Sequence, residues 1–375
     1  MKARRKRIIA ILLILAALYA ALTWFLVSAA LVPSFMRRLS DFERITKKSY
    51  TEQVQDTALQ QNYRAAQAIG RIWAEKTPHE RVTMMSEDGY ELVAMVFRQE
   101  SAAAESSAGG AGGAGGAPGD AVEAPGDAVE APRAASDAPG SAVTPDVGAQ
   151  PASHKWVITL HGYTGWKEAM YPFAAWYYGK GYNVLAPDLR CQGESEGDFI
   201  GMGWTDRLDV LGWIRMIESE DPEAQIVLHG QSMGAACALL LSGMDELPSG
   251  VMAVVSDCAY TDAVSMFSIK IRDWFHLPAF PLVDSANLML QLRGGYNLRD
   301  AAPIKAVRRS KVPILYIHGE EDRMIPVEMV RRLKDNTAGP SWMIIIPGAG
   351  HAQAADADPV VYYGTVEEFL WRCGA

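Results

Sequence analysis

Hydrophobic residues are unevenly distributed along this chain, and the first concentration of them is an uncharged run over residues 8–32. At about 1.5 Å per residue, a helix of this length spans roughly 37 Å, enough to cross a bilayer with some tilt. A cleaved signal peptide usually has an apolar core of only about 7 to 15 residues. The run therefore predicts an uncleaved transmembrane anchor, although the small residues Ser28, Ala29 and Ala30 keep cleavage open as the alternative.

Basic residues flank the apolar run on both sides. Five Lys and Arg lie in residues 1–7, and five more follow the run, at Arg37, Arg38, Arg44, Lys47 and Lys48. The first group is denser and carries the terminal amine, and cytoplasmic segments are enriched in Lys and Arg. We therefore expect a basic cytoplasmic end over residues 1–7, a single span of the cell membrane and a large extracytoplasmic domain.

The next three segments differ in their patterns. Residues 33–77 are polar with apolar residues at mixed helical spacing, which predicts a helical stalk. Residues 81–97 contain two strand-like runs on either side of Asp88 and Gly89, as expected for a hairpin. Residues 101–152 consist mainly of Ala, Gly, Pro, Ser, Asp and Glu and include two tandem copies of "APGDAVE". Such a segment buries too little apolar surface to offset its chain entropy, so we expect a disordered insert.

Short continuous apolar runs alternate with helical patterns after this insert. The runs that predict buried strands are "WVITLHG", "NVLAPD", "QIVLHG", "VMAVVSD", "PILYIHG" and "WMIIIPG". Helices are expected near residues 169–178, in "WTDRLDVLGWIRMIES" and in "MGAACALLLSG". The alternation predicts an α/β domain over residues 78–375, with a mostly parallel sheet covered by helices on both faces. Ligands of such sheets bind outside the carboxyl ends of the strands.

Composition narrows the functional classes. The chain is 49% hydrophobic and 21% charged, as in ordinary globular proteins. After residue 7 the balance is 35 minus 5, or 30, basic residues against 44 acidic ones, which gives −14. This acidic body has no basic patch interleaved with aromatic residues, so nucleic acid is not an expected partner. The four cysteines form no C-x-x-C pair and no H-E-x-x-H stretch is present, so we expect no metal, cofactor or disulfide framework.

The pattern G-x-S-x-G, which often marks a nucleophilic serine, occurs twice, around Ser195 and around Ser232. A nucleophile on a tight turn needs a strand running into the serine and a helix leaving it. Ser232 follows the predicted strand "QIVLHG" and precedes the small-residue helix "MGAACALLLSG". Ser195 lies between two glutamates and is followed by "GDFIG" instead of a helix. We therefore expect Ser232 to be the nucleophile and Ser195 to be a loop residue.

A serine hydroxyl needs a histidine as base and an acid that orients the histidine, in the chain order serine, acid, histidine for this kind of turn. His351, in "PGAGHAQ", follows the last predicted strand and is the candidate base. Asp322, just beyond the strand "PILYIHG", is the favoured acid. Its neighbours Glu320 and Glu321 are further candidates, as is Asp257 at the end of "VMAVVSD".

Three other histidines are expected to lie outside the catalytic set, and two backbone amides complete the expected site. His161, His229 and His318 each stand in an "HG" pair at a strand end and are expected to be structural. The developing oxyanion needs backbone donors, expected to be the amides of Met233, which follows the nucleophile, and of Tyr163 in "LHGYTG".

These residues resemble the α/β-hydrolase superfamily, and are similar to its bacterial membrane-anchored or exported members near serine aminopeptidases and monoacylglycerol lipases. The resemblance covers residues 81–373 without the insert, in the segments "LHGYTG", "PDLRCQGESEG", "GMGWTDRLDVLGWI", "LHGQSMGAA", "SDCAYTD", "IHGEEDRMIP" and "GAGH". It implies an α/β-hydrolase fold with a helical cap inserted after the sixth strand, at residues 261–310. Such hydrolases commonly have Gly and His where Cys191 and Gln192 stand, at positions with no catalytic role in the family.

The functional hypothesis is a serine hydrolase that cleaves a small-molecule ester through an acyl-enzyme on Ser232. An aminopeptidase with a peptide substrate, a lipase favoured by the tether, and an idle binding scaffold are the alternatives. Apolar residues of the cap are expected either to line an acyl pocket or to pack on the sheet, namely Phe267, Trp274, Phe275, Leu277 and Phe280. Substrate identity and oligomeric state do not follow from the sequence.

Overall fold

The computed structural model describes residues 2–32, 58–100 and 153–375. The disordered insert expected over residues 101–152 and the first part of the expected stalk, residues 33–57, lie outside the described residues. The remaining residues of the expected stalk form the helix α3 (Ala58–Lys76), which packs against the domain. The apolar run at the N-terminus lies within the helix α1 (Lys2–Leu31).

Within the described residues, eight strands form one sheet in the order β1-β2-β4-β3-β5-β6-β7-β8. The strands are β1 (Glu80–Met85), β2 (Glu91–Phe97), β3 (Lys155–Leu160), β4 (Asn183–Pro187), β5 (Gln225–Gln231), β6 (Val251–Asp257), β7 (Ile314–Gly319) and β8 (Ser341–Ile346). The hairpin β1–β2 and the pair β2–β4 are antiparallel, and all other pairs are parallel. The predicted hairpin and mostly parallel sheet are both confirmed.

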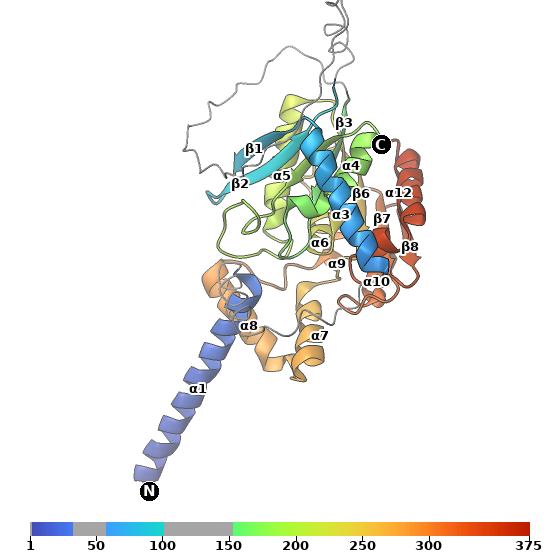
Figure 1. The fold of residues 1–375 in the computed structure, drawn as a ribbon. Coiled ribbons are helices and arrows are strands. Elements are labelled where there is room, and N and C mark those ends of the chain that lie inside the picture. The colour runs from blue at the N-terminus through green and yellow to red at the C-terminus, as the bar shows by residue number, and fades with distance from the viewer. Residues whose placement is uncertain (1, 33–57, 101–152) are drawn as a thin grey trace, which may run out of the picture. The chain divides into compact units, whose positions relative to one another are not determined.

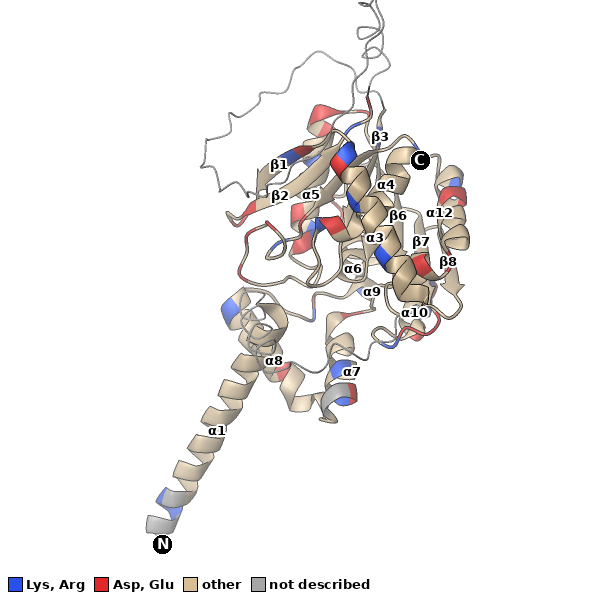
Figure 2. Cartoon of the chain, viewed as in Figure 1, with Lys and Arg blue, Asp and Glu red and all other residues tan. Residues whose placement is uncertain are grey.

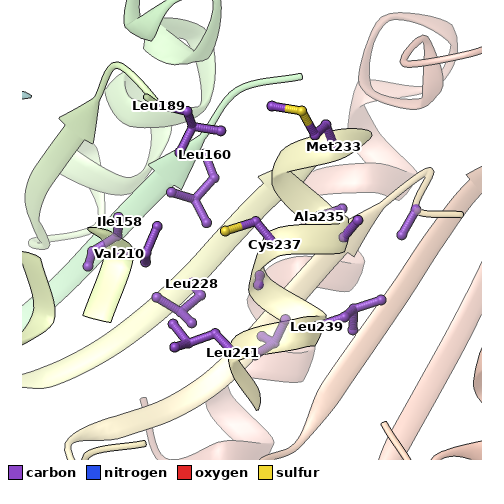
Figure 3. Close-up of a cluster of buried hydrophobic side chains, with 14 of the residues drawn as sticks. Ile158, Leu160, Leu189, Val210, Leu228, Met233, Ala235, Cys237, Leu239 and Leu241 are labelled. Atoms are coloured by element: carbon purple, nitrogen blue, oxygen red, sulfur yellow. The ribbon is translucent and has the colours of Figure 1, made fainter. Parts of the chain in front are cut away.

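Helices cover both faces of the sheet (Figure 1). One hydrophobic cluster packs side chains of α5 (Asp206–Glu220), α6 (Met233–Ser242) and α10 (Val327–Asn336) against the sheet. The other packs α3, α4 (Tyr171–Gly179) and α12 (Pro359–Cys373) against the opposite face. Because successive side chains of a strand point to opposite faces, Ile158 lies in the first cluster and its neighbour Val157 in the second. Figure 3 shows Ala235 and Cys237 of α6 in the first cluster.

The strand order reverses direction at β3. The chain runs from β3 to β4 on one side of it and returns to β5 on the other side, so the loops after β3 and β5 leave the sheet next to each other. In an open α/β sheet this reversal creates a crevice at the carboxyl ends of the strands. Ser232 follows β5 and Tyr163 lies in the loop after β3, so both lie at this point.

The segment between β6 and β7 is helical, as the resemblance implies. It contains α7 (Ala263–Phe275), α8 (Ala279–Gly294) and the short α9 (Pro303–Ala306). Asp262 caps the first of these helices, since its carboxylate accepts a hydrogen bond from the amide of Ser265 at 2.7 Å. Phe267 packs against the first hydrophobic cluster, whereas Leu277 and Phe280 are exposed. The side chains of residues 274–275 lie outside the description.

One described helix is long and apolar enough to cross a membrane, over Ile8–Leu31. A signal sequence would pass the same test of length and composition. Its Lys and Arg residues lie at its N-terminal end and none lies farther along the helix (Figure 2). Side chains such as Leu13 and Leu18 are more than 60% exposed.

Candidate active site

Ser232 lies on a sharp turn between β5 and α6. Its backbone has φ 55° and ψ −113°, a conformation that non-glycine residues rarely adopt. Two hydrogen bonds hold the turn: the Ser232 amide donates to the carbonyl of Asp257 at 2.7 Å, and the Ser232 carbonyl accepts from the amide of Ala236 at 3.0 Å. The turn therefore presents the Ser232 side chain at the carboxyl edge of the sheet.

The two glycines of "GQSMG" are required by space. A Cβ atom on Gly230 would lie 2.3 Å from the carbonyl carbon of Gly234, and a Cβ atom on Gly234 would lie 2.1 Å from the carbonyl oxygen of Leu160. Neither distance is compatible with a side chain, because the contacted atoms belong to backbone. These glycines let α6 begin directly against β5 and β3.

Ser232, His351 and Asp322 form a chain of hydrogen bonds. Ser232 Oγ lies 2.9 Å from His351 Nε2, and His351 Nδ1 lies 2.7 Å from Asp322 Oδ2. The Asp322 carboxylate is buried and His351 is about one-fifth exposed, with 22% of its side chain accessible. The three residues come from the turn after β5, the loop after β7 and the loop after β8. The structure thus brings all three predicted side chains together, in the order that lets a carboxylate orient an imidazole and the imidazole face a hydroxyl.

Asp322 is held as a carboxylate by several donors. Its Oδ1 accepts hydrogen bonds from the amides of Met324 and Ile325, both at 2.8 Å. Burial by itself would raise the pKa of Asp322, but the hydrogen bonds from His318 and His351 outweigh it and lower the pKa well below its usual value. An ionised carboxylate facing Nδ1 favours the His351 tautomer whose Nε2 can accept a proton from Ser232.

The other candidate acids are placed differently. Glu320 and Glu321 are exposed. Asp257 is fully buried, and its Oδ2 accepts hydrogen bonds from Gln231 at 3.3 Å and from the hydroxyl of Tyr362 at 3.2 Å. Burial raises the pKa of Asp257, which favours its neutral form. The geometry therefore favours Asp322 over the alternatives as the partner of His351.

His318 contacts the site, which its sequence setting did not predict. Its Nε2 donates to the carbonyl of Ile325 at 2.8 Å and lies 3.3 Å from Asp322 Oδ2. His318 is the last but one residue of β7, so its side chain braces the loop that carries Asp322. The signal available in the sequence is the spacing of four residues between His318 and Asp322 across a strand end.

His229 and His161 make hydrogen bonds away from the serine. His229 lies between the hydroxyls of Tyr177 and Tyr362, at 3.1 Å and 3.0 Å. Burial lowers the pKa of His229 to about 3, so the ring is neutral at physiological pH. His161 Nδ1 donates to the carbonyl of Gly162 at 2.8 Å, and its Nε2 accepts from the amide of Leu189 at 2.9 Å. His161 thereby fastens the loop after β3 to the segment after β4.

The loop after β3 lies against Ser232. A Cβ atom on Gly162 would be 3.4 Å from Cβ and 4.0 Å from Oγ of Ser232, so the backbone that leads into Tyr163 borders the hydroxyl. On the other side, Met233 is the first residue of α6, and the first amides of a helix have no partner within the helix. Both expected oxyanion donors therefore belong to backbone segments next to Ser232.

A buried ion pair supports this loop. Lys167 follows it in the short 3-10 helix η1 (Lys167–Met170) and is almost fully buried. Its Nζ lies 2.8 Å from Asp188 Oδ2 and 2.6 Å from Glu194 Oε1. Removing one partner of such a buried pair leaves an uncompensated charge, which strongly destabilises the local structure.

Cys258, Asp322 and His351 offer potential ligand atoms within 4.8 Å of one another. The two atoms that form the His351–Asp322 hydrogen bond are only 2.7 Å apart. A tetrahedral zinc ion that held both at about 2.0–2.1 Å would separate them by roughly 3.3 Å. The arrangement fits the hydrogen-bonded pair better than a shared metal.

A surface depression of about 360 Å³ lies away from these residues. Side chains of α3 and of the segment before α4 line it, namely Tyr63, Arg64, Gln67, Arg71, Trp166, Glu168 and Ala169. No member of the serine, histidine and aspartate set borders it. The acyl pocket expected beneath the cap stays a prediction.

Known proteins are similar to this chain in sequence. The sequence profile described as the alpha/beta hydrolase family matches residues 157–361. The protein YqkD of Bacillus subtilis is 29% identical over 215 residues, which cover 57% of this chain and 70% of YqkD. The lysophosphatidylserine lipase ABHD12 of Bos taurus is 27% identical over 207 residues, covering 52% of this chain and 48% of the lipase.

Solved structures share the fold. An esterase from Pyrococcus furiosus superimposes with a TM-score of 0.53 at 21% identity, over 80% of this chain and 93% of the esterase. The acylaminoacyl peptidase of Pyrococcus horikoshii superimposes with a TM-score of 0.51 at 17% identity, over 81% of this chain and 43% of the peptidase. At these identities the likeness concerns the fold alone.

Proposed function

Because this chain belongs to the alpha/beta hydrolase family, we propose that it is a serine hydrolase that cleaves an ester through an acyl-enzyme on Ser232. The observation that carries this proposal is the continuous hydrogen-bond chain from Ser232 through His351 to Asp322. It begins at a serine on a strained strand-to-helix turn, where a hydroxyl is exposed to substrate. The family match and the lipase among the similar sequences support hydrolysis as the reaction class.

In the proposed reaction, His351 Nε2 takes the proton of Ser232 as its Oγ attacks the ester carbonyl. Asp322 stabilises the imidazolium that results. The amides of Met233 and Tyr163 donate hydrogen bonds to the oxyanion of the tetrahedral intermediate. His351 then gives its proton to the leaving alcohol, and the same steps with water as the nucleophile release the acid.

The choice between ester and amide is tested with purified full-length protein. A chain-length series of p-nitrophenyl esters is compared with aminoacyl p-nitroanilides, by kcat/KM. We expect an ester to be the best substrate. Faster cleavage of an aminoacyl amide than of every ester would replace the esterase by the aminopeptidase alternative. No turnover of any substrate, together with no reaction of Ser232 with a fluorophosphonate, would leave only the idle scaffold.

A lipase is the second candidate, and exposed apolar side chains on the cap favour it. Phe280 is 74%, Leu288 58% and Leu292 76% exposed, all on α8. The same helix contacts α1, the candidate membrane span. An apolar surface beside a membrane span is suited to lipid molecules. Rates that rise steeply when a medium-chain ester passes its critical micelle concentration would favour the lipase, and rates that follow monomer concentration would exclude it.

The cellular placement is proposed with the function. We place the chain in the cell membrane through a single span within Ile8–Leu31, with the hydrolase domain extracytoplasmic. The basic residues at the N-terminal end of α1 support this orientation. Protease added to intact cells is expected to digest the domain and to spare a tag placed before Met1. Digestion only after lysis would reverse the orientation, and a mature N-terminus near Ala30 would identify a cleaved signal sequence.

A further inference from the structure

The last turns of α1 are packed into the hydrolase domain, unlike the rest of the helix. Thr23, Val27, Ser28 and Leu31 are each no more than 4% exposed, whereas Leu18 is 62% exposed. Leu31 also belongs to the same hydrophobic cluster as α5 and α6. A helix that served only as a tether would have no reason to bury its C-terminal end in the domain. The packing suggests a second role for this end of α1.

The domain supplies hydrogen-bond donors to the end of this helix. The last carbonyls of any helix lack partners within it. Here the Tyr163 hydroxyl donates to the carbonyl of Ala30, and the amide of Ile200 donates to the carbonyl of Leu31 at 2.9 Å. Burial raises the pKa of Tyr163 to about 12, so its hydroxyl stays protonated and able to donate at neutral pH.

The cap holds the same part of α1. Arg293, at the end of α8, donates from Nη1 to the hydroxyl of Ser28 at 2.9 Å, and its guanidinium lies 5.0 Å from the ring centre of Trp24. A cation near a helix C-terminus also interacts favourably with the helix dipole. Five residues before Trp24, the hydroxyl of Tyr19 lies 2.8 Å from the hydroxyl of Ser285. The helix is therefore fixed from two sides, by the cap and by the loop after β3.

We propose that the last turn of α1 positions the oxyanion loop, through the hydrogen bond between the Tyr163 hydroxyl and the Ala30 carbonyl. The inference rests on the proposed function, in which the amide of the same Tyr163 binds the oxyanion. The loop is a tight turn, since the amide of Gly165 donates to the carbonyl of Gly162 at 3.0 Å and Thr164 has φ 55°. Fixing the side chain of Tyr163 therefore fixes the direction of its amide. Tyr163 is in this respect a positioning residue as well as an amide donor.

This role of α1 bears on whether the N-terminal segment is cleaved. Cleavage beside Ser28, Ala29 or Ala30 would separate the capped turn from the helix that holds it. The active protein therefore retains α1, and the helix belongs to the catalytic unit as well as to the membrane anchor.

The first test replaces Tyr163 by Phe in the full-length protein in nanodiscs, because this change removes the hydroxyl and leaves the backbone amide. We expect kcat on an activated ester to fall about tenfold, with KM within about twofold, since small displacements of a catalytic group reduce the rate strongly. The rate constant of fluorophosphonate labelling at Ser232 should fall in parallel. A merely structural loss would instead lower the fraction of protein that is labelled at saturation.

Tyr178→Phe is the matched control. Its hydroxyl donates to the carbonyl of Arg98 at 3.1 Å, so the change removes the same kind of bond away from Ser232. Kinetics of Tyr163→Phe equal to those of the control and the wild type would overturn the proposal. Failure of the proposed function is recognised separately, because the wild type would then neither hydrolyse esters nor react with the probe at Ser232.

A second measurement leaves every residue of the native chain in place. A protease recognition sequence is inserted between residues 33 and 57, and the assembled protein in nanodiscs is cut there. We expect the cut domain to stay bound to α1 with its activity unchanged, or to lose at least tenfold in kcat if it is released. Release of a domain with full activity would show that α1 is only a tether.

Discussion

Two segments of this chain share the pattern G-x-S-x-G and fold in opposite ways. Around Ser232, a strand enters and a helix leaves, and the hydroxyl faces His351 at 2.9 Å. Around Ser195, the chain forms a loop after β4, and the hydroxyl is buried, donating to the carbonyl of Asp188 at 2.7 Å and accepting from the amide of Val93 at 2.9 Å. The hydroxyl of Ser232 thus faces a histidine, whereas that of Ser195 fastens a loop to β2.

The glycines of the two segments differ in their backbone conformation. Gly193 and Gly197 have positive φ angles of 57° and 140°, and a Cβ atom on Gly193 would also lie 2.1 Å from the side chain of Asp188, so the loop needs both their conformational freedom and their small size. Gly230 and Gly234 have no such φ and are required because backbone atoms lie within 2.3 Å of where a Cβ would stand. The pattern of five letters is therefore ambiguous, and the flanking strand and helix decide between the two structures.

Replacing each serine by alanine should give the largest difference in activity between the two segments. Ser232→Ala is expected to lower kcat/KM on an ester by at least about 10⁴-fold, because the nucleophile and base act as a unit. The melting temperature should change little, since Ser232 is not fully buried. Steady-state kinetics of both serine variants measure the difference. Comparable losses of activity in Ser195→Ala would break the comparison.

The two aspartates near the Ser232 turn should differ as well. Asp322→Asn is expected to lower kcat by about 10²- to 10⁴-fold, because an amide facing Nδ1 no longer favours the required His351 tautomer. Asp257→Asn should lower kcat less than tenfold, because the Asp257 carboxyl bonds to Gln231 and Tyr362 and burial raises its pKa. Equal kinetic losses in these two variants would show that both carboxyls are needed to orient His351.

Acid should loosen the strand that leads to Ser232 before it loosens the loop around Ser195. The pKa of His229 is lowered to about 3, while an unfolded histidine titrates near 6.5. As the pH falls, the unfolded chain binds this proton before the folded chain does. The contribution of neutral His229 to the free energy of unfolding is therefore fully present above about pH 6.5 and is lost as the pH decreases. The hydrogen bond from Lys167 lowers the pKa of Glu194 below its ordinary value of 4.5. The contribution of Glu194 to the free energy of unfolding is therefore present above pH 4.5 and is lost only below it.

The His229→Gln variant measures the first part of this difference. Between pH 7 and pH 4.5 the wild type should lose roughly 2–3 kcal/mol more of its unfolding free energy than His229→Gln does. Chemical denaturation at the two pH values provides the measurement. An equal pH dependence in both proteins would show that His229 is not held neutral by its surroundings.

The smallest expected effect belongs to Ser195→Ala. The change leaves the buried amide of Val93 without its acceptor, which costs about 1–3 kcal/mol of stability. Activity at saturating ester should stay within a few-fold of the wild type, because the residue contacts neither Ser232 nor His351. Unfolding by urea, measured beside Ser195→Thr as the conservative control, gives the stability change.

The sequence predicted the parts of the site that local pattern encodes. Ser232 was identifiable because strand, turn and small-residue helix are contiguous, and His351 because it follows the last strand in the order that this chemistry uses. Asp322 could only be favoured over three other acids, since the choice depends on which carboxylate faces Nδ1 at 2.7 Å. His318 contacts Asp322, and α1 contacts Tyr163. Both contacts depend on how side chains pack after folding, so the local sequence pattern does not predict them.

The ends of helices were also predicted only approximately from the sequence. A helix was expected near residues 169–178, and the structure has the turn η1 followed by α4 from Tyr171. Pro172 lies in the first turn of α4, where its missing amide hydrogen is not needed. The alternation of strands and helices predicted the helix, and a single proline helped to determine its first residue.

The central claim is that Ser232 is the nucleophile, and mapping the site of covalent labelling tests it most directly. Full-length wild type, Ser232→Ala and Ser195→Ala are treated with a fluorophosphonate and digested, and the adduct is located by mass spectrometry. The account predicts an adduct on Ser232 in the wild type and in Ser195→Ala, and none in Ser232→Ala. An adduct on Ser195, or equal labelling of folded Ser232→Ala, would contradict it.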